Sequence, residues 1–417
     1  MKKEPLRQLN PEDAGFSYTL PSEYYTSPVI YENELDVIFA NSWNIGCHLS
    51  QVNEPGKYVR CKVGDEEIVI TRDKENKLHA YYNVCRHRAH TLIQNDAGKV
   101  NFITCPYHAW TYNLDGTART VRNCENVEGF CKEEFSLVEA RLEELAGFVW
   151  VNLNIDAEPL IKQAPDLEAK LLEHCPDIHK LKFAHRETWD IKANWKTAID
   201  NFSECYHCAT AHPGFVDLVS MPDYTVTTHG IWNAHVSPVP ENLNGPLKVV
   251  AADGKRLEYV AIYLWPNMTI WIMPGAGNIG LLYMLPTGPE TTRENMDFYF
   301  LDEKPTEEEM ASIEYLREVL LPEDVDLCEK VQKGLKSRSY DIARPFATRR
   351  SPPGSRRVDT PTPPASASRC PSCRSACSGT SPPPRPSRAP SATASPPSPC
   401  RSRTRRRRRS ASRPPAR

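Results

Sequence analysis

Two short pairs of metal-binding side chains, Cys85-Arg-His87 and Cys105-Pro-Tyr-His108, constrain the fold of this chain more than any other feature. Each pair offers one thiolate and one imidazole from a tight loop. The surrounding segments alternate between apolar and polar residues, which predicts short antiparallel strands. We expect a small antiparallel β unit over residues 44–155, with strands at residues 57–63, 67–71, 78–84, 101–104, 110–114 and 147–153.

The order of the ligands within the two pairs indicates which metal they bind. Two Cys on one iron and two His on the other is the ligand set of a Rieske [2Fe–2S] centre, where neutral imidazoles raise the reduction potential. A zinc site is the alternative, but zinc fingers normally keep Cys with Cys and His with His. The alternating order therefore predicts that Cys85, His87, Cys105 and His108 hold an iron–sulfur cluster.

A second pair of histidines, His207 and His212, lies near the end of a helical segment at residues 193–214. Apolar residues recur there at steps of three and four, the period of a buried amphipathic helix. Five residues of ideal helix turn the two imidazoles about 140° apart, so they can converge only if the helix stops or takes a π-bulge. Pro213 favours a stop. Two imidazoles plus a carboxylate are typical of non-heme Fe(II) oxygenases, and two unrelated histidines are the alternative.

The remaining sequence predicts a second domain, residues 156–346, that combines helices with a sheet. Residues 1–43 are expected to pack against it. We expect helices at residues 32–42 and 160–172 and a long one beginning at Thr306, with strands at 259–272, 280–285 and 295–301. The fold class is therefore α+β, with a small antiparallel β domain and a larger helix-and-sheet domain.

Composition divides the chain at about Ala347. Residues 347–417 contain 17 Arg, no Lys and one acid, a charge of +16; the whole chain carries −2, so residues 1–346 carry −18. Such a segment has too few large apolar side chains to offset its ordering entropy, and we expect it to be disordered. A nucleic-acid arm, a metal-binding appendage through Cys370 and Cys373, and a GC-rich sequence read out of frame are the alternatives. We favour the frameshift because the change is abrupt and a zinc site needs four ligands.

The other signals predict a cytoplasmic protein. Ten of the 14 Cys precede the tail and show no regular framework, so we expect free or metal-bound thiols in a reducing compartment. The first residues lack the apolar core of a signal peptide, and no run of about 18 apolar residues suggests a membrane span. We therefore expect neither a membrane nor a nucleic acid as a partner.

Together these motifs resemble those of the α subunits of Rieske non-heme iron oxygenases, over residues 30–340. That family carries Cys-x-His and Cys-x2-His about seventeen residues apart, and later a helix with Asn, an acid and two His. This chain matches the later motif with Asn201, Glu204, His207 and His212. Neither loop has the additional Cys of respiratory-chain Rieske proteins. The resemblance implies a Rieske domain joined to a helix-grip, START-like catalytic domain that binds a mononuclear Fe(II).

The resemblance also implies roles for two acids. The family's third iron ligand is an Asp near the start of the final helix, and Asp324 matches it, with Glu323 and Asp326 as competitors. The position of Glu204 is Asp in most of the family, where it bridges a Rieske histidine of one subunit to an iron-ligand histidine of the next. Glu204 is thus implied to carry electrons between subunits of a homotrimer, with His108 at the Rieske end.

Glu rather than Asp at this position is similar to oxygenase components of the carnitine monooxygenase type. Their relatives attack quaternary ammonium compounds, namely carnitine, γ-butyrobetaine and glycine betaine. The resemblance implies electrons from NADH through a separate flavin and iron–sulfur reductase, O₂-dependent hydroxylation beside a C–N bond, and release of trimethylamine and malic semialdehyde from carnitine. No Gly-x-Gly-x2-Gly motif follows a strand, so we expect the reductase to be another polypeptide.

Aromatic residues fit a trimethylammonium substrate, which has no N–H groups to donate and is attracted by aromatic faces. The sequence predicts Tyr263, Trp265 and Trp271 along one strand, and Phe202 and Tyr206 on the iron helix; ordinary core packing is the alternative. The charge of −18 adds a weak attraction for cations. A pure electron carrier, a glycine betaine demethylase and an aromatic ring-hydroxylating oxygenase are the alternative functions.

Overall fold

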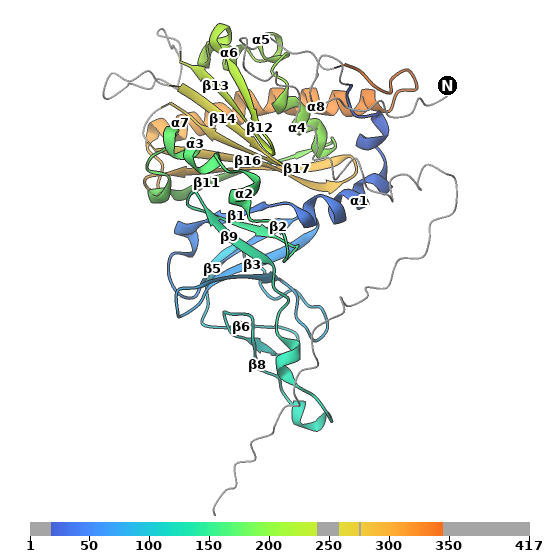
Figure 1. The fold of residues 1–417 in the computed structure, drawn as a ribbon, viewed down its shortest axis with the longest axis vertical. Helices are drawn as coiled ribbons and strands as arrows, with labels where there is room; N and C mark the ends of the chain where they lie inside the picture. The colour runs from blue at the N-terminus through green and yellow to red at the C-terminus, as the bar shows by residue number, and fades with distance from the viewer. Residues whose placement is uncertain (1–17, 240–257, 275–276, 345–417) are drawn as a thin grey trace, which may run out of the picture.

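The structure is a computed structural model that describes residues 18–239, 258–274 and 277–344. The predicted tail at 347–417 lies outside the described residues, as do residues 1–17 of the predicted N-terminal segment. Two units follow one another along the long axis of the molecule, a β-rich unit and a larger unit of helices and sheet (Figure 1).

Short antiparallel strands build the β-rich unit, because apolar residues alternate along each strand and polar residues form the turns. The turn after β3, for example, is held by Asp73, whose carboxylate accepts hydrogen bonds from the amides of Glu75 and Lys77. The three sheets have the orders β1-β10-β9, β4-β3-β2-β5 and β6-β7-β8. The strands are β1 (Asn44–His48), β2 (Lys57–Val63), β3 (Glu66–Arg72), β4 (Leu78–Tyr82), β5 (Ala97–Lys99), β6 (Ile103–Thr104), β7 (Thr111–Tyr112), β8 (Ala118–Thr120), β9 (Arg141–Leu145) and β10 (Phe148–Asn152).

A seven-stranded antiparallel sheet forms the centre of the larger unit, in the order β11-β17-β16-β15-β14-β13-β12. Its strands are β11 (Lys182–Ile191), β12 (Thr225–His229), β13 (Trp232–Pro238), β14 (Glu258–Leu264), β15 (Met268–Ile272), β16 (Asn278–Gly288) and β17 (Thr291–Phe300). The inner strands are buried on both faces. Both faces of the sheet must therefore be covered by other elements.

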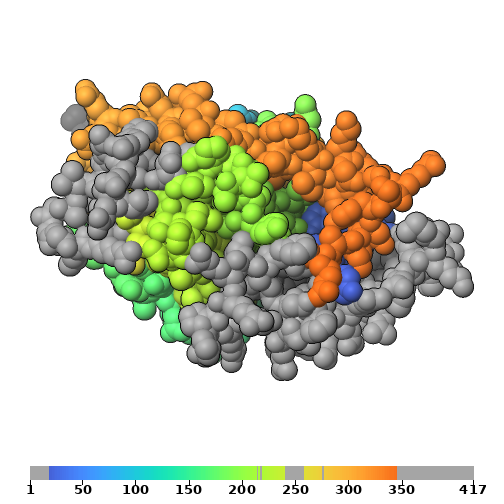
Figure 2. All heavy atoms as spheres, turned by 90° about the horizontal axis from the view of Figure 1, so that it is seen from above, coloured from blue at the N-terminus to red at the C-terminus, as the bar shows by residue number. Residues whose placement is uncertain are grey.

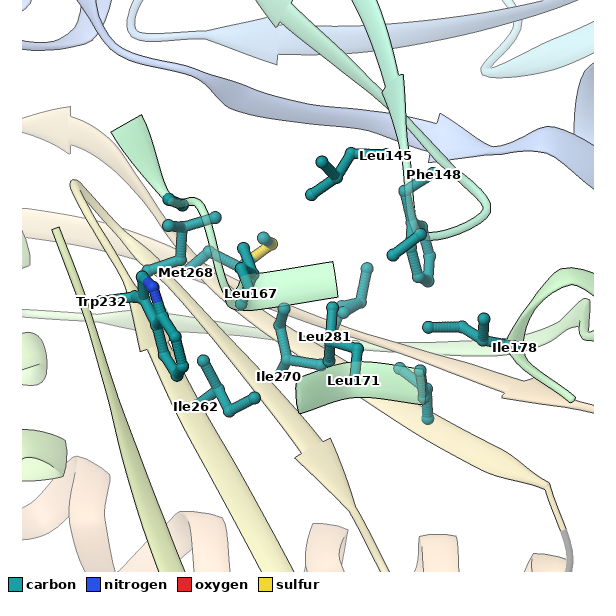
Figure 3. Close-up of a cluster of buried hydrophobic side chains, with 14 of the residues drawn as sticks. Leu145, Phe148, Leu167, Leu171, Ile178, Trp232, Ile262, Met268, Ile270 and Leu281 are labelled. Carbon is teal, nitrogen blue, oxygen red and sulfur yellow. The ribbon is translucent and has the colours of Figure 1, made fainter. Parts of the chain in front are cut away.

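Helices cover one face of this sheet, where side chains of α4, α6 and α8 join sheet residues in one apolar cluster. On the other face, Leu145 and Phe148 of the β-rich unit meet Leu171 of α3 and Ile270 and Leu281 of the sheet (Figure 3). The helices are α1 (Pro28–Val37), α2 (Leu160–Gln163), α3 (Leu167–His174), α4 (Trp195–Ser203), α5 (Cys208–Ala211), α6 (Pro213–Leu218), α7 (Glu307–Tyr315) and α8 (Leu321–Leu335). Within the described ranges, none is both long and apolar enough to cross a bilayer.

Buried polar contacts with the N-terminal segment fix the position of α4. The ammonium of Lys196 lies 2.7 Å from the carboxylate of Glu34 in α1, and the Trp195 indole donates to the same carboxylate at 3.0 Å. One turn later, the Tyr25 hydroxyl donates to Asp200 at 2.5 Å. A buried charge is strongly destabilising without its partner, so these contacts determine where the far end of α4 lies.

Some predicted elements differ from those in the structure. The helix expected at 160–172 is divided into α2 and α3 around Pro165, because proline lacks the amide that a continuous helix requires. The strand expected at 259–272 is a hairpin of β14 and β15, with a cis peptide bond between Trp265 and Pro266 in its turn. The helix expected at 32–42 begins earlier, at Pro28. The strands that were not predicted are β1, β5, β8, β9, β11, β12 and β13.

Candidate metal centres

The loops that carry the Cys-x-His and Cys-x2-His pairs share one backbone conformation. The amide of Cys85 donates to the carbonyl of His90 at 2.9 Å, and the amide of Cys105 donates to that of Trp110 at 2.8 Å. In each loop the residue four positions after the Cys, Ala89 or Ala109, donates to the Cys carbonyl at 3.0 Å and has a left-handed backbone, with φ of 56° and 55°. The two loops therefore present their side chains as a matched pair.

The four predicted cluster residues are brought together with sulfur inside and imidazole outside. Cys85 and Cys105 are buried at 2% exposure each, whereas His108 is exposed, and the Nδ1 atoms of His87 and His108 lie 3.2 Å apart. Burial raises the pKa of Cys85, although a contact with the Tyr112 hydroxyl at 3.2 Å opposes the rise. Two facing thiols and two facing imidazoles are the donor set of a Rieske cluster, so the residues present fit that group.

The second pair of histidines converges because the helix stops. α4 ends at Ser203, His207 directly precedes α5, and His212 separates α5 from α6, which begins at Pro213. The two imidazole rings come within 5.0 Å, centre to centre. The predicted helix stop is therefore confirmed. A π-helical turn occurs in a different segment, at Leu316–Leu320, directly before α8.

Asp324 on α8 joins the two histidines. Its Oδ1 atom lies 2.9 Å from Nε2 of His212 and 3.9 Å from Nε2 of His207, and one atom from each of the three residues falls within 4.8 Å of the others. Asn201 on α4 donates to the same carboxylate oxygen. Each imidazole contacts a protein oxygen through Nδ1, at 2.8 Å, so that Nε2 faces the carboxylate: His207 contacts the carbonyl of Glu204, and His212 contacts the carboxylate of Glu323.

These contacts distinguish the three candidate acids. Glu323 contacts Nδ1 of His212 and so orients the ring without reaching Nε2. Asp326 is exposed and paired with Lys330 at 2.5 Å. The nearby carboxylate of Asp324, with a smaller contribution from Glu323, raises the pKa of His212 to about 9, because both acids stabilise the imidazolium. The Nε2 atom of His212 is buried and makes no well-directed hydrogen bond. A buried nitrogen of this kind beside a carboxylate and a second imidazole fits a divalent metal.

Glu204 occupies the junction between α4 and the histidines. It caps the C-terminus of α4, is half buried, and offers its backbone carbonyl to His207.

The next residue, Cys205, forms a disulfide with Cys208 across a Cα separation of 5.1 Å, within the range that the bond needs. The expectation of free or metal-bound thiols was therefore wrong for this pair; the other eight Cys of the described residues form no disulfide.

A pocket opens beside the three candidate iron ligands, between α4, α8 and the helical face of the sheet. Phe202 and Trp271 line it as proposed, but Tyr263 and Trp265 do not, and Tyr206 is 61% exposed. Trp265 lies in the β14–β15 turn, which explains why it does not share a strand face with Trp271. Sequence reasoning missed other lining residues, among them Phe215, Tyr224, Tyr259 and Glu294.

The two candidate centres lie far apart within one chain. The loops beside β6 are at one end of the molecule, and α5 and α6 are at the other (Figure 1). At that second end, the light green segment of α5 and α6 lies beside the orange α7 and α8 (Figure 2). A single chain therefore does not bring its two centres into contact.

Comparison with known families agrees with this division. Residues 42–131 match the Rieske [2Fe-2S] domain, and residues 178–353 match the catalytic domain of the ring hydroxylating alpha subunit. The carnitine monooxygenase oxygenase subunit of Escherichia coli (strain K12) is 41% identical over 334 residues, which are 79% of this chain and 87% of the relative.

Solved structures show the same relationship. A quaternary ammonium Rieske monooxygenase in complex with L-carnitine is 39% identical, with a TM-score of 0.72 over 81% of this chain and 92% of the other. Another structure of such an enzyme, reported with insights into carnitine oxidation and inter-subunit electron transfer, is 38% identical, with a TM-score of 0.75 over 82% and 93%. This chain is therefore a Rieske-type monooxygenase of the Rieske non-heme iron oxygenase α-subunit family, whose members combine a [2Fe–2S] cluster with a mononuclear iron.

Proposed function

We propose that this chain is the terminal oxygenase of a carnitine-oxidising system. The single observation that carries the proposal is a pocket that combines aromatic walls with the His207, His212 and Asp324 cluster and has no Lys or Arg among its described lining residues. Aromatic faces and negative potential suit a quaternary ammonium ion. The similarity to carnitine monooxygenase subunits supports carnitine as the substrate within this class.

In this proposal, Cys85, His87, Cys105 and His108 hold the cluster, and His207, His212 and Asp324 hold the iron. Bound Fe(II) supplies the chemistry that activates O₂. The chain's own residues prepare the site: Asn201 fixes the Asp324 carboxylate by hydrogen bonding. Glu323 and the Glu204 carbonyl hold the two imidazoles with Nε2 inward. Such supporting contacts set the tautomer and orientation of histidine ligands.

Electrons are proposed to come from NADH through a separate flavin and iron–sulfur reductase. Because one chain holds its two centres at opposite ends, we propose a homotrimer in which the cluster of one subunit serves the iron of its neighbour. Exposed His108 and half-buried Glu204 are suited to meet across that interface. Their proposed hydrogen bond is the route between the subunits, by analogy with the inter-subunit transfer reported for the related enzyme.

The proposed reaction places a hydroxyl on the carbon that bears the trimethylammonium group of carnitine. One oxygen atom enters the substrate, and the other becomes water with two electrons and two protons. The hydroxylated carbon then expels trimethylamine as its C–N bond breaks, and loss of the hydroxyl proton leaves malic semialdehyde. Once the substrate fills the pocket, its aromatic lining is proposed to keep bulk water from the reacting carbon.

Trimethylamine release from L-carnitine under air, with NADH and a compatible reductase, tests this function. We expect release by the wild type and none by Glu204→Ala, with the cluster signal in electron paramagnetic resonance and the iron content unchanged in both. Glu308→Gln, which removes an exposed acid from the first turn of α7, is the control for the lost charge. Oxidation of glycine betaine or of an aromatic acid, but not carnitine, by a fully metallated wild type contradicts the proposal.

A further inference from the structure

Glu294 occupies a position where the pattern of its strand demands an apolar residue. Side chains of β17 alternate between the two faces of the sheet. Met296 and Phe298, on the same face as Glu294, belong to the apolar cluster beneath α4 and α8. Across the ladder, Glu294 pairs with Trp189 on β11 and Met284 on β16. The strand therefore places a carboxylate on the apolar, helix-covered face.

This carboxylate is buried without a partner. Glu294 is 5% exposed, and no residue of the described ranges forms a hydrogen bond or an ion pair with its side chain. Burial, with a smaller contribution from the charge of Asp324, raises its pKa to about 8. Buried polar groups in proteins are nearly always paired, and an unpaired buried acid is destabilising. The Glu294 oxygens are not among the fully shielded unpaired atoms of the described residues, so the carboxylate is open to the pocket, where a ligand can supply its partner.

The surroundings of Glu294 favour a cationic ligand. It lines the pocket together with Asp324 and Cys328 of α8. Burial raises the pKa of Cys328, and the charge of Glu294 adds to that rise. Asp324 is already engaged by Asn201 and His212, so Glu294 is the uncommitted acid. The ring centres of Phe202 and Trp271 lie 6.0 Å apart in the same pocket. A carboxylate beside aromatic faces is the environment that attracts a cation with no hydrogen-bond donors.

We propose that Glu294 is a specificity-determining residue, whose carboxylate receives the positive charge of a quaternary ammonium substrate in the pocket beside His207, His212 and Asp324. The assignment rests on the proposed function and goes further, because it names the group that separates a cationic substrate from a neutral one of the same shape. The ligand supplies the missing charge partner, and the aromatic rings enclose its methyl groups. With a neutral substrate the acid keeps its proton at neutral pH and adds no charge attraction, whereas a cation stabilises the ionised form and the proton is released to solvent.

Calorimetric binding to the full-length, iron-loaded protein tests the assignment with two ligands, L-carnitine and its neutral isostere, in which a tert-butyl group replaces trimethylammonium. For Glu294→Gln we expect carnitine affinity to fall about 10- to 100-fold, with affinity for the isostere unchanged or improved. Glu294→Asp keeps the charge and is expected to retain the preference for carnitine, with weaker binding. Glu308→Gln is the matched control and leaves both affinities unchanged.

The outcomes separate this inference from the proposed function. Wild-type protein that binds no quaternary ammonium compound, carnitine, γ-butyrobetaine and glycine betaine included, overturns the proposed function and this assignment with it. Wild-type protein that binds carnitine while Glu294→Gln weakens both ligands equally, or neither, overturns the assignment alone, since the residue then acts by packing. An unaltered cluster signal and iron content in each variant establish that the folded site is being compared.

Discussion

The two candidate metal centres differ in how far apart in the sequence their residues lie. All four residues of the Rieske centre fall between Cys85 and His108, in two loops with the same hydrogen bonds. At the iron centre, His207 and His212 meet Asp324, which is more than a hundred residues later on α8. The first centre is a local structure, whereas the second exists only when the sheet and both helices are in place.

The two centres also differ in how exposed their residues are to solvent. The Rieske histidines lie toward solvent with only their cysteines buried, which suits electron exchange with a partner. At the other centre His212 is 4% exposed and its neighbours line a pocket, which suits a small substrate. We therefore expect the two centres to be structurally independent within a chain and, in the proposed trimer, to depend on each other between chains for activity.

Removing one ligand from each centre gives the largest expected effect and tests structural independence. Cys85→Ser is expected to abolish the cluster signal while iron still binds at the other site, and His212→Ala to abolish iron binding while the cluster remains. Both variants lose all oxygenase activity, because the reaction needs both groups. Iron analysis and electron paramagnetic resonance measure the two centres separately; loss of both from either single substitution contradicts their independence.

Mixing these two inactive variants tests functional dependence between chains. In randomly mixed trimers, an intact cluster lies beside an intact iron at about a quarter of the junctions, so we expect about a quarter of wild-type activity to return. Co-expression or subunit exchange, followed by the trimethylamine assay, measures the recovery. Continued inactivity of verified mixed trimers is evidence that each chain uses its own two centres, contrary to the proposed route through Glu204.

The same contrast explains how much could be predicted from the sequence. The spacing of Cys85, His87, Cys105 and His108 is sufficient to propose a cluster, because the loop itself brings these residues together. His207 and His212 were recognisable as a pair, yet their convergence depends on helix breaks that periodicity indicates only through Pro213. No period or spacing connects them to α8, and Asp324 was proposed from family resemblance alone.

The pocket was the least predictable part. Tyr224, directly before β12, and Tyr259 on β14 line it through long-range packing, which no local pattern encodes. Trp265 was misplaced because the turn at Pro266 interrupts what looked like one long strand. Glu294 left a usable signal, an acid that alternates with Met296 and Phe298 along a strand. An exposed strand edge produces the same pattern, so the sequence alone does not distinguish the two.

Neutralising the acid behind His212 has a smaller expected effect and tests how far the iron centre depends on α8. Glu323→Gln removes the charge that orients this imidazole through Nδ1, and we expect iron affinity to fall about 10- to 100-fold, as for other supporting contacts of metal ligands. Asp326→Asn is the matched control, because Asp326 is on the same helix but pairs with Lys330 at the surface. Equal effects of the two substitutions indicate a general electrostatic effect; iron titration with a competing chelator measures them.

The smallest expected effect concerns the stability of the iron-free protein and relates the pocket to folding. The pKa of Glu294 is raised by burial from 4.5 to about 8, so between these values the folded state binds more protons than the unfolded state. Stability attributable to this residue is therefore greatest below about pH 4.5 and declines as the pH rises toward 8. Glu294→Gln removes the titrating group and this decline.

We expect Glu294→Gln and wild type to have similar melting temperatures near pH 5, and the variant to be more stable near pH 8. Because water can enter the pocket, the difference is expected to be on the order of 1 kcal/mol, less than full conversion of the pKa shift gives. Glu308→Gln at both pH values controls for net charge. A variant less stable than wild type at pH 8 means that Glu294 has a structural partner in the folded chain; a more stable one means that the residue is retained for binding at the expense of stability.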